Sequence, residues 1–322
     1  MRKIFIFKVS SSNKIGSGHI YRSIKIAKKL STKKSLFITN NFKGNFNSLL
    51  KRYKVKILKN SEKKFNIKKD LNETIQEVKK YHIKKILIID NYLNNLNWQK
   101  SISKYVDKIV IINDYLSKNF CDLYINENFF LNKKINNIFF KKKCKKLIGL
   151  KYCLISNRKL KKIKPIKPNI FLFFGGSDEK NLTIKILKKL RYNKNCYFHI
   201  VVNNIVLINK IKKLNLINIK IYPQKNNFYT ILRKCNYALI SGGSTIWDII
   251  YNQIPLIAIP TAKNQITNLN NLKKKKIIFL YKKKIDKNFV KYFNIFVSDS
   301  IRPSNLIDGL GLKRVVKEIN II

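Results

Sequence analysis

The sequence predicts an α/β fold with two domains, each of them a parallel β-sheet with helices on both faces. Short runs rich in Ile, Phe, Val and Leu recur along the chain and alternate with amphipathic, helix-like segments, a pattern typical of parallel sheets. A lysine-rich stretch with two prolines, residues 158–168, interrupts this alternation, which then starts again. Hydrophobic residues make up 45% of the 322 positions, which is enough for packed cores.

The predicted strands follow one another along the two halves of the chain. In the N-terminal half they are the apolar runs 4–9, 35–39, 85–90 and 108–113, with helix-like patterns such as 20–30 and 70–81 between them. In the C-terminal half they are the runs 169–174, 197–202, 219–222, 237–240 and 254–260. We therefore expect a Rossmann-like domain over 1–157, a linker over 158–168 and a second Rossmann-like domain over 169–322, whose last helix is a candidate for packing back on the first.

The expected site follows from this architecture. Ligands of open parallel sheets bind at the carboxyl ends of the strands. Two such domains facing each other would form a central cleft, and clefts between domains are common substrate sites. The loops that follow the predicted strands are therefore the place to look for chemistry.

The charge of the chain is extreme, with a formal net value of +53, but it does not indicate a nucleic-acid partner. All but eight of the 69 basic residues are lysines, and they are scattered over almost every segment. Proteins that read nucleic acids favour arginine for bidentate contacts. Lys, Asn and Ile share A/T-rich codons, so codon bias explains the composition. The positive field is still attractive to a phosphorylated ligand.

The cysteines, the apolar runs and the N-terminus indicate which compartment and which cofactors to expect. Five cysteines show no C-x-x-C spacing, which fits a reducing compartment and argues against a zinc site. No apolar run approaches the roughly 18 residues that a membrane span needs, and the N-terminus shows no cleavage site of a signal peptide. We expect a monomeric, cytoplasmic protein without a metal, a cofactor or a stable membrane insertion.

The first carboxyl-end loop and the start of its helix read KIGSGHIYRS, residues 14–23. Gly16 and Gly18 allow close backbone approach, and the first turn of the helix offers free N–H groups to an anion. His19 would lie in that turn, where the helix dipole favours a neutral imidazole, and a neutral imidazole suits a general base. Arg22 follows one turn later on the same face. A glycine turn with an incidental surface histidine is the alternative.

Two further loops of the N-terminal half end in polar residues. Asp90 and Tyr92 follow the third predicted strand; Asp90 either orients a base or caps the next helix, and Tyr92 could line a sugar pocket. Asn113 and Asp114 end the fourth strand, where they could also form only a turn. The first two of these loops make His19, Tyr92 and Asp90 the candidate catalytic residues.

The C-terminal half has two glycine-rich loops that follow a predicted strand and precede a helix. A diphosphate needs close N–H donors without competing side chains, and glycine with Ser or Thr supplies them. The candidate diphosphate-binding residues are Gly175, Gly176, Ser177, Gly242, Gly243, Ser244 and Thr245. Asp248, one turn into the second helix, could bind ribose hydroxyls.

A last strand end carries an amide pair, Asn264 and Gln265, which could bind sugar hydroxyls or simply cap the next helix. Two other histidines are weaker candidates. His82 lies among lysines between a helix and a strand, and His199 lies within a predicted strand, where a core or edge position is expected. Neither has the partners that a metal site would need.

Taken in chain order, these loops resemble one family, the UDP-2,4-diacetamido-2,4,6-trideoxy-β-L-altropyranose hydrolases of pseudaminic acid biosynthesis, which are related to the glycosyltransferase-B (GT-B) fold. Each motif is modest alone, but eight in the same order are specific, and they span nearly the whole chain. The matching segments are 10–22, 88–92, 113–126, 149–155, 173–183, 241–248, 263–265 and 307–316.

The resemblance implies a GT-B-like fold and a metal-independent, inverting hydrolase, in which water attacks the anomeric carbon of the sugar and UDP leaves. His19 matches the catalytic histidine of the family, and Tyr92 matches a tyrosine of its active site. Asn264 and Gln265 match its amide pair, and the helix start at Ser244–Thr245 matches its UDP site. UDP is a good leaving group, so the protein need only position water and neutralise phosphate charge.

The chain also departs from the family pattern. Lys8 and Ser10 stand where the family usually has Arg and Asp, and Asp248 stands where it usually has Glu. A related nucleotide sugar is therefore an open alternative. Two other classes also stay open, namely a GT-B glycosyltransferase that uses a UDP-sugar and a non-catalytic protein that binds nucleotide sugars.

Overall fold

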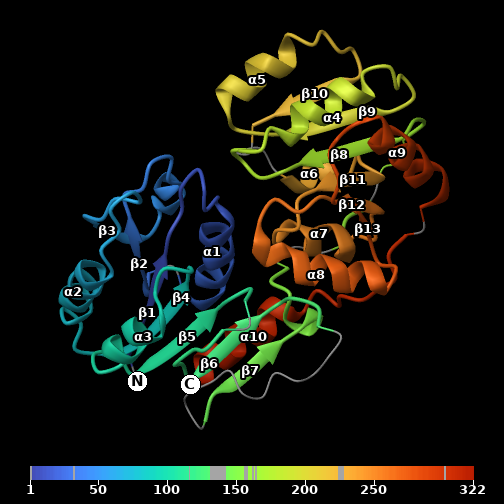
Figure 1. Cartoon of the computed structure of the whole chain (residues 1–322). Coiled ribbons are helices and arrows are strands. Elements are labelled where there is room, and N and C mark those ends of the chain that lie inside the picture. The colour runs from blue at the N-terminus through green and yellow to red at the C-terminus, as the bar shows by residue number, and fades with distance from the viewer. Residues whose placement is uncertain are drawn as a thin grey trace. The chain divides into compact units, whose positions relative to one another are not determined.

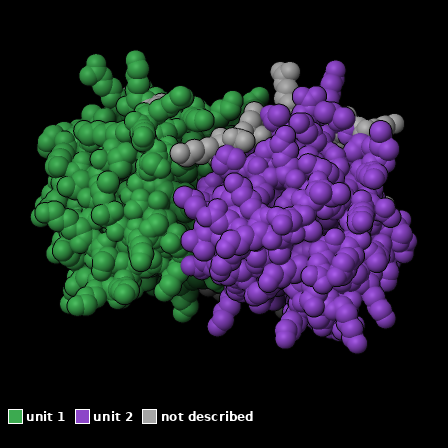
Figure 2. All heavy atoms as spheres, turned by 90° about the horizontal axis from the view of Figure 1, so that it is seen from above, with its two compact units in different colours: residues 1–156, 309–322 green, residues 157–308 purple. Residues whose placement is uncertain are grey.

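The computed structural model describes most of the chain as two compact units. The described residues are 2–31, 33–115, 117–130, 143–155, 159–161, 163, 165–223, 228–300 and 302–322. The first unit combines Met1–Ser156 with Gly309–Ile322, and the second is Asn157–Asp308 (Figure 1). Figure 2 gives residues 309–322 the colour of the first unit, to which they belong although they follow the second in sequence.

The first unit is built on a seven-stranded parallel sheet with the order β3-β2-β1-β4-β5-β6-β7. Its strands are β1 (Lys3–Val9), β2 (Ser35–Asn40), β3 (Lys54–Leu58), β4 (Lys84–Asp90), β5 (Lys108–Ile112), β6 (Leu123–Asn126) and β7 (Lys145–Ile148). The strand order reverses between β1 and β4, as in doubly wound folds. The prediction of a parallel α/β domain is confirmed.

The sequence analysis did not predict three strands of this sheet. The edge strands β3 (KVKIL) and β7 (KKLI) expose half of their residues or more to partial or full solvent contact, so they lack the continuous apolar run of a buried parallel strand. The strand β6 is buried but only four residues long. Short and edge strands therefore give a weak periodic signal.

The helices of the first unit cover both faces of its sheet (Figure 1). They are α1 (Gly18–Leu30), the 3₁₀ helix η1 (Asn47–Leu50), α2 (Ile67–Val78), α3 (Leu96–Ile102), the 3₁₀ helix η2 (Leu150–Tyr152) and α10 (Gly311–Ile321). Because successive strand residues point to opposite faces, Phe5 and Phe7 of β1 pack with α1 and α10. Ile4 and Ile6 pack with α2 and α3 on the other face.

Within the first unit, the C-terminal helix α10 packs directly against the backbone of Tyr152 and Cys153. A Cβ atom at Gly311 would lie 2.2 Å from the carbonyl oxygen of Cys153, so any side chain there would force the helix away. The Arg314 guanidinium then donates to the carbonyl of Lys151 at 2.9 Å. The end of the chain thereby completes the core over α1.

The second unit has a six-stranded parallel sheet with the order β10-β9-β8-β11-β12-β13. Its strands are β8 (Asn169–Phe173), β9 (Tyr197–Val201), β10 (Ile219–Tyr222), β11 (Tyr237–Ile240), β12 (Leu256–Ala258) and β13 (Phe279–Leu280). Its helices are α4 (Leu182–Leu190), α5 (Ile205–Lys212), α6 (Phe228–Leu232), α7 (Thr245–Tyr251), α8 (Lys263–Lys274) and α9 (Lys287–Asp299). This confirms the prediction of a second parallel α/β domain.

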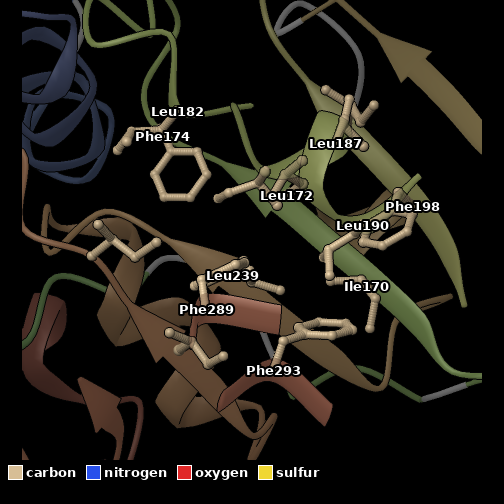
Figure 3. Packing of buried hydrophobic residues seen from close by; sticks show 14 of the residues in the cluster. Ile170, Leu172, Phe174, Leu182, Leu187, Leu190, Phe198, Leu239, Phe289 and Phe293 are labelled. Carbon is tan, nitrogen blue, oxygen red and sulfur yellow. The ribbon is translucent and has the colours of Figure 1, made fainter. Parts of the chain in front are cut away.

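One core cluster of the second unit joins α4, α5 and α9 to one face of the sheet. Leu172 of β8, Leu190 of α4 and Phe293 of α9 are almost fully buried within it, and Figure 3 shows these side chains close together. Within the described part of the chain, we find no helix long and apolar enough to cross a membrane.

Candidate active site

The strand order of the first unit brings four loops to one edge of its sheet. The strands β1, β4, β5 and β6 are neighbours in the sheet, and all run parallel. Val9, the last residue of β1, pairs in register with Asp90, the last residue of β4. The helix α1 begins at this edge, so its first turn lies beside the end of β4.

His19 in the first turn of α1 is held by Asp90. The His19 Nδ1 atom lies 2.6 Å from Asp90 Oδ1, and both side chains are buried. Since an ionised carboxylate can only accept, Nδ1 carries a proton, and in that tautomer of the ring Nε2 is the acceptor. Nε2 has no hydrogen-bond partner among the described residues. The pair has the geometry of a base held by an orienting acid.

Arg22, one turn further along α1, is shared by three carboxylates. Its Nε and Nη2 atoms donate to the two oxygens of Asp90 at 3.0 and 2.6 Å. Its Nη1 atom donates to Asp114 Oδ1 at 2.8 Å and to Glu127 Oε1 at 3.5 Å. A planar guanidinium suits such a bidentate arrangement. Arg22 therefore joins the ends of β4, β5 and β6.

This cluster sets the charge states of its members. Burial alone would raise the pKa of Asp90, but Arg22 and His19 lower it to about 2. Burial would likewise raise the pKa of Asp114, and Arg22 with the Tyr92 hydroxyl holds it below its usual value. Burial would lower the pKa of Arg22, but the carboxylates raise it well above its ordinary value. Asp90 is therefore ionised at neutral pH.

Tyr92 lies beside the imidazole. Its ring meets the His19 ring edge-on, with centroids 4.9 Å apart, and its hydroxyl donates to Asp114 Oδ2. Partial burial and the Asp114 carboxylate raise the pKa of Tyr92, so the phenol stays protonated. The structure thus brings together the three candidates His19, Asp90 and Tyr92. Asp90 does not cap the following helix α3, because Asn95 does so by accepting from Trp98 N.

Sequence reasoning missed Glu127. It follows β6, is 3% exposed, and its Oε2 atom accepts from the backbone N–H of Leu154 at 2.9 Å. Burial raises its pKa despite the nearby guanidinium of Arg22. The available signal was its place directly after β6, since Asp90 likewise lies at the carboxyl end of a buried strand.

The glycine loop before α1 leaves room at the helix start. Gly16 has φ +79°, and its N–H donates to the carbonyl of Ser12 at 2.8 Å. Gly18 is the first residue of α1, and a Cβ there would meet no atom within 4 Å. The side chain of the N-cap residue Ser17 makes no capping bond. The first turn of α1 is therefore open on its outer side.

Lys8 belongs to a separate buried network on the opposite face of β1. Its ammonium group lies 2.7 Å from Asp70 Oδ2 of α2, and both residues are fully buried. Asp70 also accepts from Trp98 Nε1 at 3.1 Å and from the Asn94 amide at 3.2 Å. Burial lowers the pKa of Lys8, and Asp70 opposes that change. Lys8 thus stabilises the packing of α2 on β1 and belongs to this network rather than to the cluster around His19.

In the second unit, the loop after β8 is organised by Asp178. Gly175 has φ +89°, and the carbonyls of Gly176 and Ser177 accept from Asn203 and Asn204. The Asp178 carboxylate accepts from the N–H groups of residues 182 and 183 at 3.0 and 2.8 Å. These two amides of α4 are therefore already occupied, and a ligand would have to use the glycine turn itself.

The loop after β11 contains the other glycine pair. A Cβ at Gly242 would come within 2.7 Å of Leu269 Cδ1 of α8, whereas a Cβ at Gly243 would have Ser241 Oγ as its nearest atom, at 4.0 Å. The Gln265 Oε1 atom accepts from Gly242 N at 3.2 Å and from Thr261 N at 2.8 Å. Gln265 therefore ties the ends of β11 and β12 together, and Gly243 is the less crowded glycine of the pair.

The remaining candidates of the second unit lie around α7. Ser244 is its N-cap, Thr245 is its first residue, and neither is fully buried. Asp248 is buried in the first turn and accepts from the Tyr229 hydroxyl of α6 at 2.9 Å. Asn264, in the first turn of α8, is partly exposed. Gly243, Ser244, Asp248 and Gln265 thus belong to neighbouring strand ends of one sheet.

The other histidines lie away from these groups. His199 of β9 is buried, stacks on Tyr222 and contacts its hydroxyl at 3.0 Å. Burial, with Lys234 and Lys220 nearby, lowers the pKa of His199 to about 4. His82 is exposed between α2 and β4. Over the described ranges, no group of three or more His, Cys, Asp or Glu side chains is placed to hold a metal ion.

Comparison with known sequences supports the motif-based resemblance. No family model matches the chain. It is 26% identical over 278 residues to the UDP-2,4-diacetamido-2,4,6-trideoxy-β-L-altropyranose hydrolase of Campylobacter jejuni, which covers 84% of this chain and 96% of that protein. It is also 26% identical over 277 residues to the uncharacterized protein MJ1062 of Methanocaldococcus jannaschii, covering 77% and 54%. The resemblance to the hydrolase is confirmed.

Comparison with solved structures identifies the fold. MurG of Acinetobacter baumannii superposes with a TM-score of 0.68 at 12% identity, covering 100% of both chains. The calicheamicin glycosyltransferase CalG4 gives 0.63 at 10% identity, covering 100% and 98%. A UDP-N-acetylglucosamine 2-epimerase gives 0.61 at 9% identity, covering 99% and 96%. The predicted GT-B-like fold is confirmed, since glycosyltransferases and epimerases of this architecture are its structural neighbours.

Proposed function

We propose that this protein hydrolyses a UDP-linked 2,4-diacetamido-2,4,6-trideoxyhexose to the free sugar and UDP, by a metal-independent reaction that inverts the anomeric carbon. The observation that carries the proposal is the buried His19–Asp90 pair, whose Nε2 atom is available as a proton acceptor. The likeness to the Campylobacter jejuni hydrolase supports the substrate class. The place of this reaction would be the biosynthesis of pseudaminic (nonulosonic) acid, in the cytoplasm, by a monomer.

His19 is the proposed general base. A water molecule at Nε2 loses its proton to the imidazole while its oxygen attacks the anomeric carbon. The bond between that carbon and the phosphate oxygen breaks, and its electron pair leaves with UDP. Asp90, ionised because its pKa is about 2, holds the tautomer and stabilises the imidazolium that forms, as an orienting acid does in hydrolytic triads.

Arg22 and Tyr92 are the proposed positioning groups of this side. Arg22 fixes both oxygens of Asp90, so the carboxylate cannot rotate away from the imidazole. Tyr92 presents its ring beside His19 while Asp114 holds its hydroxyl. The open start of α1 at Gly16 and Gly18 leaves room for a sugar. Holding reactants in a fixed geometry is a large part of such catalysis.

The second unit is the proposed UDP-binding side. Gly243, which is less crowded than Gly242, and Ser244 and Thr245 are the proposed backbone and hydroxyl donors to the diphosphate. Asp248, whose carboxylate accepts from the Tyr229 hydroxyl, is the proposed acceptor for ribose hydroxyls. The turn of Gly175, Gly176 and Ser177 is a second candidate phosphate contact, and Asn264 and Gln265 are candidate sugar contacts.

The test is UDP release from the diacetamido UDP-sugar in EDTA, with the anomer of the first product followed by NMR. We expect wild-type turnover and inverted product, and a loss of about 10²–10⁴-fold in kcat for His19→Ala. The exposed His82→Ala is the matched control and should keep wild-type activity. No release by the wild type, or equal activity of His19→Ala, would refute the proposal.

Transfer to an acceptor other than water is the second candidate, because solved structures with this fold include glycosyltransferases. The same assay separates the two reactions. A hydrolase releases UDP and free sugar in equal amounts without any acceptor. A transferase releases UDP only when an acceptor is added, and free sugar does not accumulate.

A further inference from the structure

Tyr115 is an exposed aromatic residue that no part of the proposed mechanism uses. It follows Asp114 at the carboxyl end of β5 and meets Tyr92 edge-on, with ring centroids 5.1 Å apart and planes at 75°. Each of the two tyrosines is 42% exposed. Together, Tyr92 and Tyr115, which we call the tyrosine pair, form an aromatic surface at the carboxyl ends of β4 and β5, beside His19 of α1.

The tyrosine pair is held in place from behind. The Tyr115 N–H donates to Asn113 Oδ1 at 2.9 Å, and the Tyr115 carbonyl accepts from the Tyr124 hydroxyl at 2.6 Å. Tyr124 itself is fully buried. The Tyr92 hydroxyl is fixed by Asp114. The rings are thus anchored through their polar groups or backbone, and their apolar parts stay in contact with solvent.

The tyrosine pair is in contact with the imidazole of the proposed base, His19. The His19 ring meets Tyr92 at 4.9 Å, and Tyr92 meets Tyr115 at 5.1 Å, so the three rings form a row. A sugar whose anomeric carbon receives water from His19 would lie close to this row. Aromatic rings that combine an anchored polar end with a free apolar body are suited to binding ligands of mixed polarity.

We infer that the tyrosine pair is a specificity-determining surface, with Tyr115 binding the apolar substituents of the sugar. The sugar of the related hydrolase has such groups, namely two acetamido groups and a deoxygenated carbon 6. Their methyl groups pack on aromatic rings, whereas a hydroxymethyl or hydroxyl group gains less from the same contact. This inference rests on the proposed function, since it takes the sugar to lie beside His19.

The experiment compares two substrates, the UDP-diacetamido-trideoxy sugar and UDP-N-acetylglucosamine. We expect Tyr115→Ala to lower kcat/KM for the first sugar by about 10-fold or more, since one lost apolar contact is worth about 10–200-fold. The change should appear mainly in KM and be much smaller for UDP-N-acetylglucosamine. Tyr115→Phe should keep wild-type values, because the ring and not its hydroxyl makes the contact. The exposed Tyr192→Ala is the matched control.

Binding of both UDP-sugars is measured by calorimetry with the same variants. If the wild type releases no UDP but binds the diacetamido sugar more tightly, and Tyr115→Ala removes that preference, the hydrolase proposal fails while the inference stands. An unchanged kcat/KM in Tyr115→Ala would overturn the inference. An equal loss for both sugars, a Tyr115→Phe defect as large as that of Tyr115→Ala, or binding of neither sugar by the wild type would overturn it as well.

Discussion

Replacing Asp90 with asparagine should inactivate the proposed base while the protein stays folded. Asp90 is fully buried and accepts from His19 at 2.6 Å and from Arg22 at 2.6 and 3.0 Å. An asparagine can turn its NH₂ group toward His19 Nδ1, which then becomes the acceptor and moves the ring proton to Nε2. Water would then meet a donor instead of a base. In hydrolytic triads the same exchange lowers kcat by about 10⁴-fold, so we expect a loss of about 10³–10⁴-fold.

The same substitution has a worked effect on stability. The pKa of Asp90 is about 2 in the folded protein and about 3.9 when unfolded. This difference contributes about 2–3 kcal/mol to the free energy of unfolding at neutral pH. Because the folded pKa is depressed, this stabilisation is present above pH 4 and is lost as the pH falls toward 2. The loss in Asp90→Asn should stay near this value, since Arg22 keeps its bond to Asp114 at 2.8 Å.

The assay combines kcat for UDP release with urea unfolding at pH 7 and at pH 3. Asp299→Asn, at an exposed acid in the last turn of α9, is the control and should change neither quantity. The wild type should lose more stability between pH 7 and pH 3 than Asp90→Asn. If Asp90→Asn folds normally and keeps kcat within 10-fold of the wild type, the assignment of His19 and Asp90 is wrong.

Three further predictions concern the framework. Lys8→Met should lower the free energy of unfolding by about 3 kcal/mol, because it leaves the buried Asp70 carboxylate without its cation. The double variant Lys8→Met/Asp70→Asn should recover part of that loss in urea unfolding, and no recovery would contradict the pairing. Gly242→Ala should destabilise the protein by about 1–3 kcal/mol, because its Cβ would clash with a leucine of α8. Gly243→Ala should melt like the wild type but bind UDP more weakly in calorimetry, and equal melting of both variants would argue against this packing. Gly311→Ala should lower the melting temperature and increase amide exchange in α10, because its Cβ would overlap a backbone carbonyl of the first unit; an unchanged exchange rate would show that the helix tolerates a shift.

The candidate site was only partly accessible from the sequence. His19 and Arg22 are three residues apart on one helix, so their common face follows from helix periodicity alone. Asp90 was recognised as polar at a strand end, but two interpretations stayed open until the structure placed it on His19 and placed Asn95 at the cap of α3. Glu127 was missed because β6 is only four residues long. The roles of these residues in a reaction stay predictions.

The glycines illustrate a second limit of sequence reasoning. Gly242 and Gly243 are adjacent and chemically identical, and the sequence assigns both to ligand binding. The structure separates them, because only Gly242 faces α8 at a distance that excludes a side chain. The close approach of Gly311 to Cys153 could not be read from the sequence, since the two residues lie far apart along the chain. Close approach between distant segments leaves no local pattern.

The sequence by itself determined the alternation of strands and helices, the two parallel sheets and the loops that hold polar residues. These features follow from burial and periodicity, which are local properties of neighbouring residues. Tertiary structure decided which charges meet. Arg22 contacts Asp90, Asp114 and Glu127 only because β4, β5 and β6 are adjacent in the sheet, and that order is an outcome of packing. Electrostatic partners act through space, so the charge state of Asp90 and the proposed basicity of His19 depend on contacts that no single segment of the sequence contains.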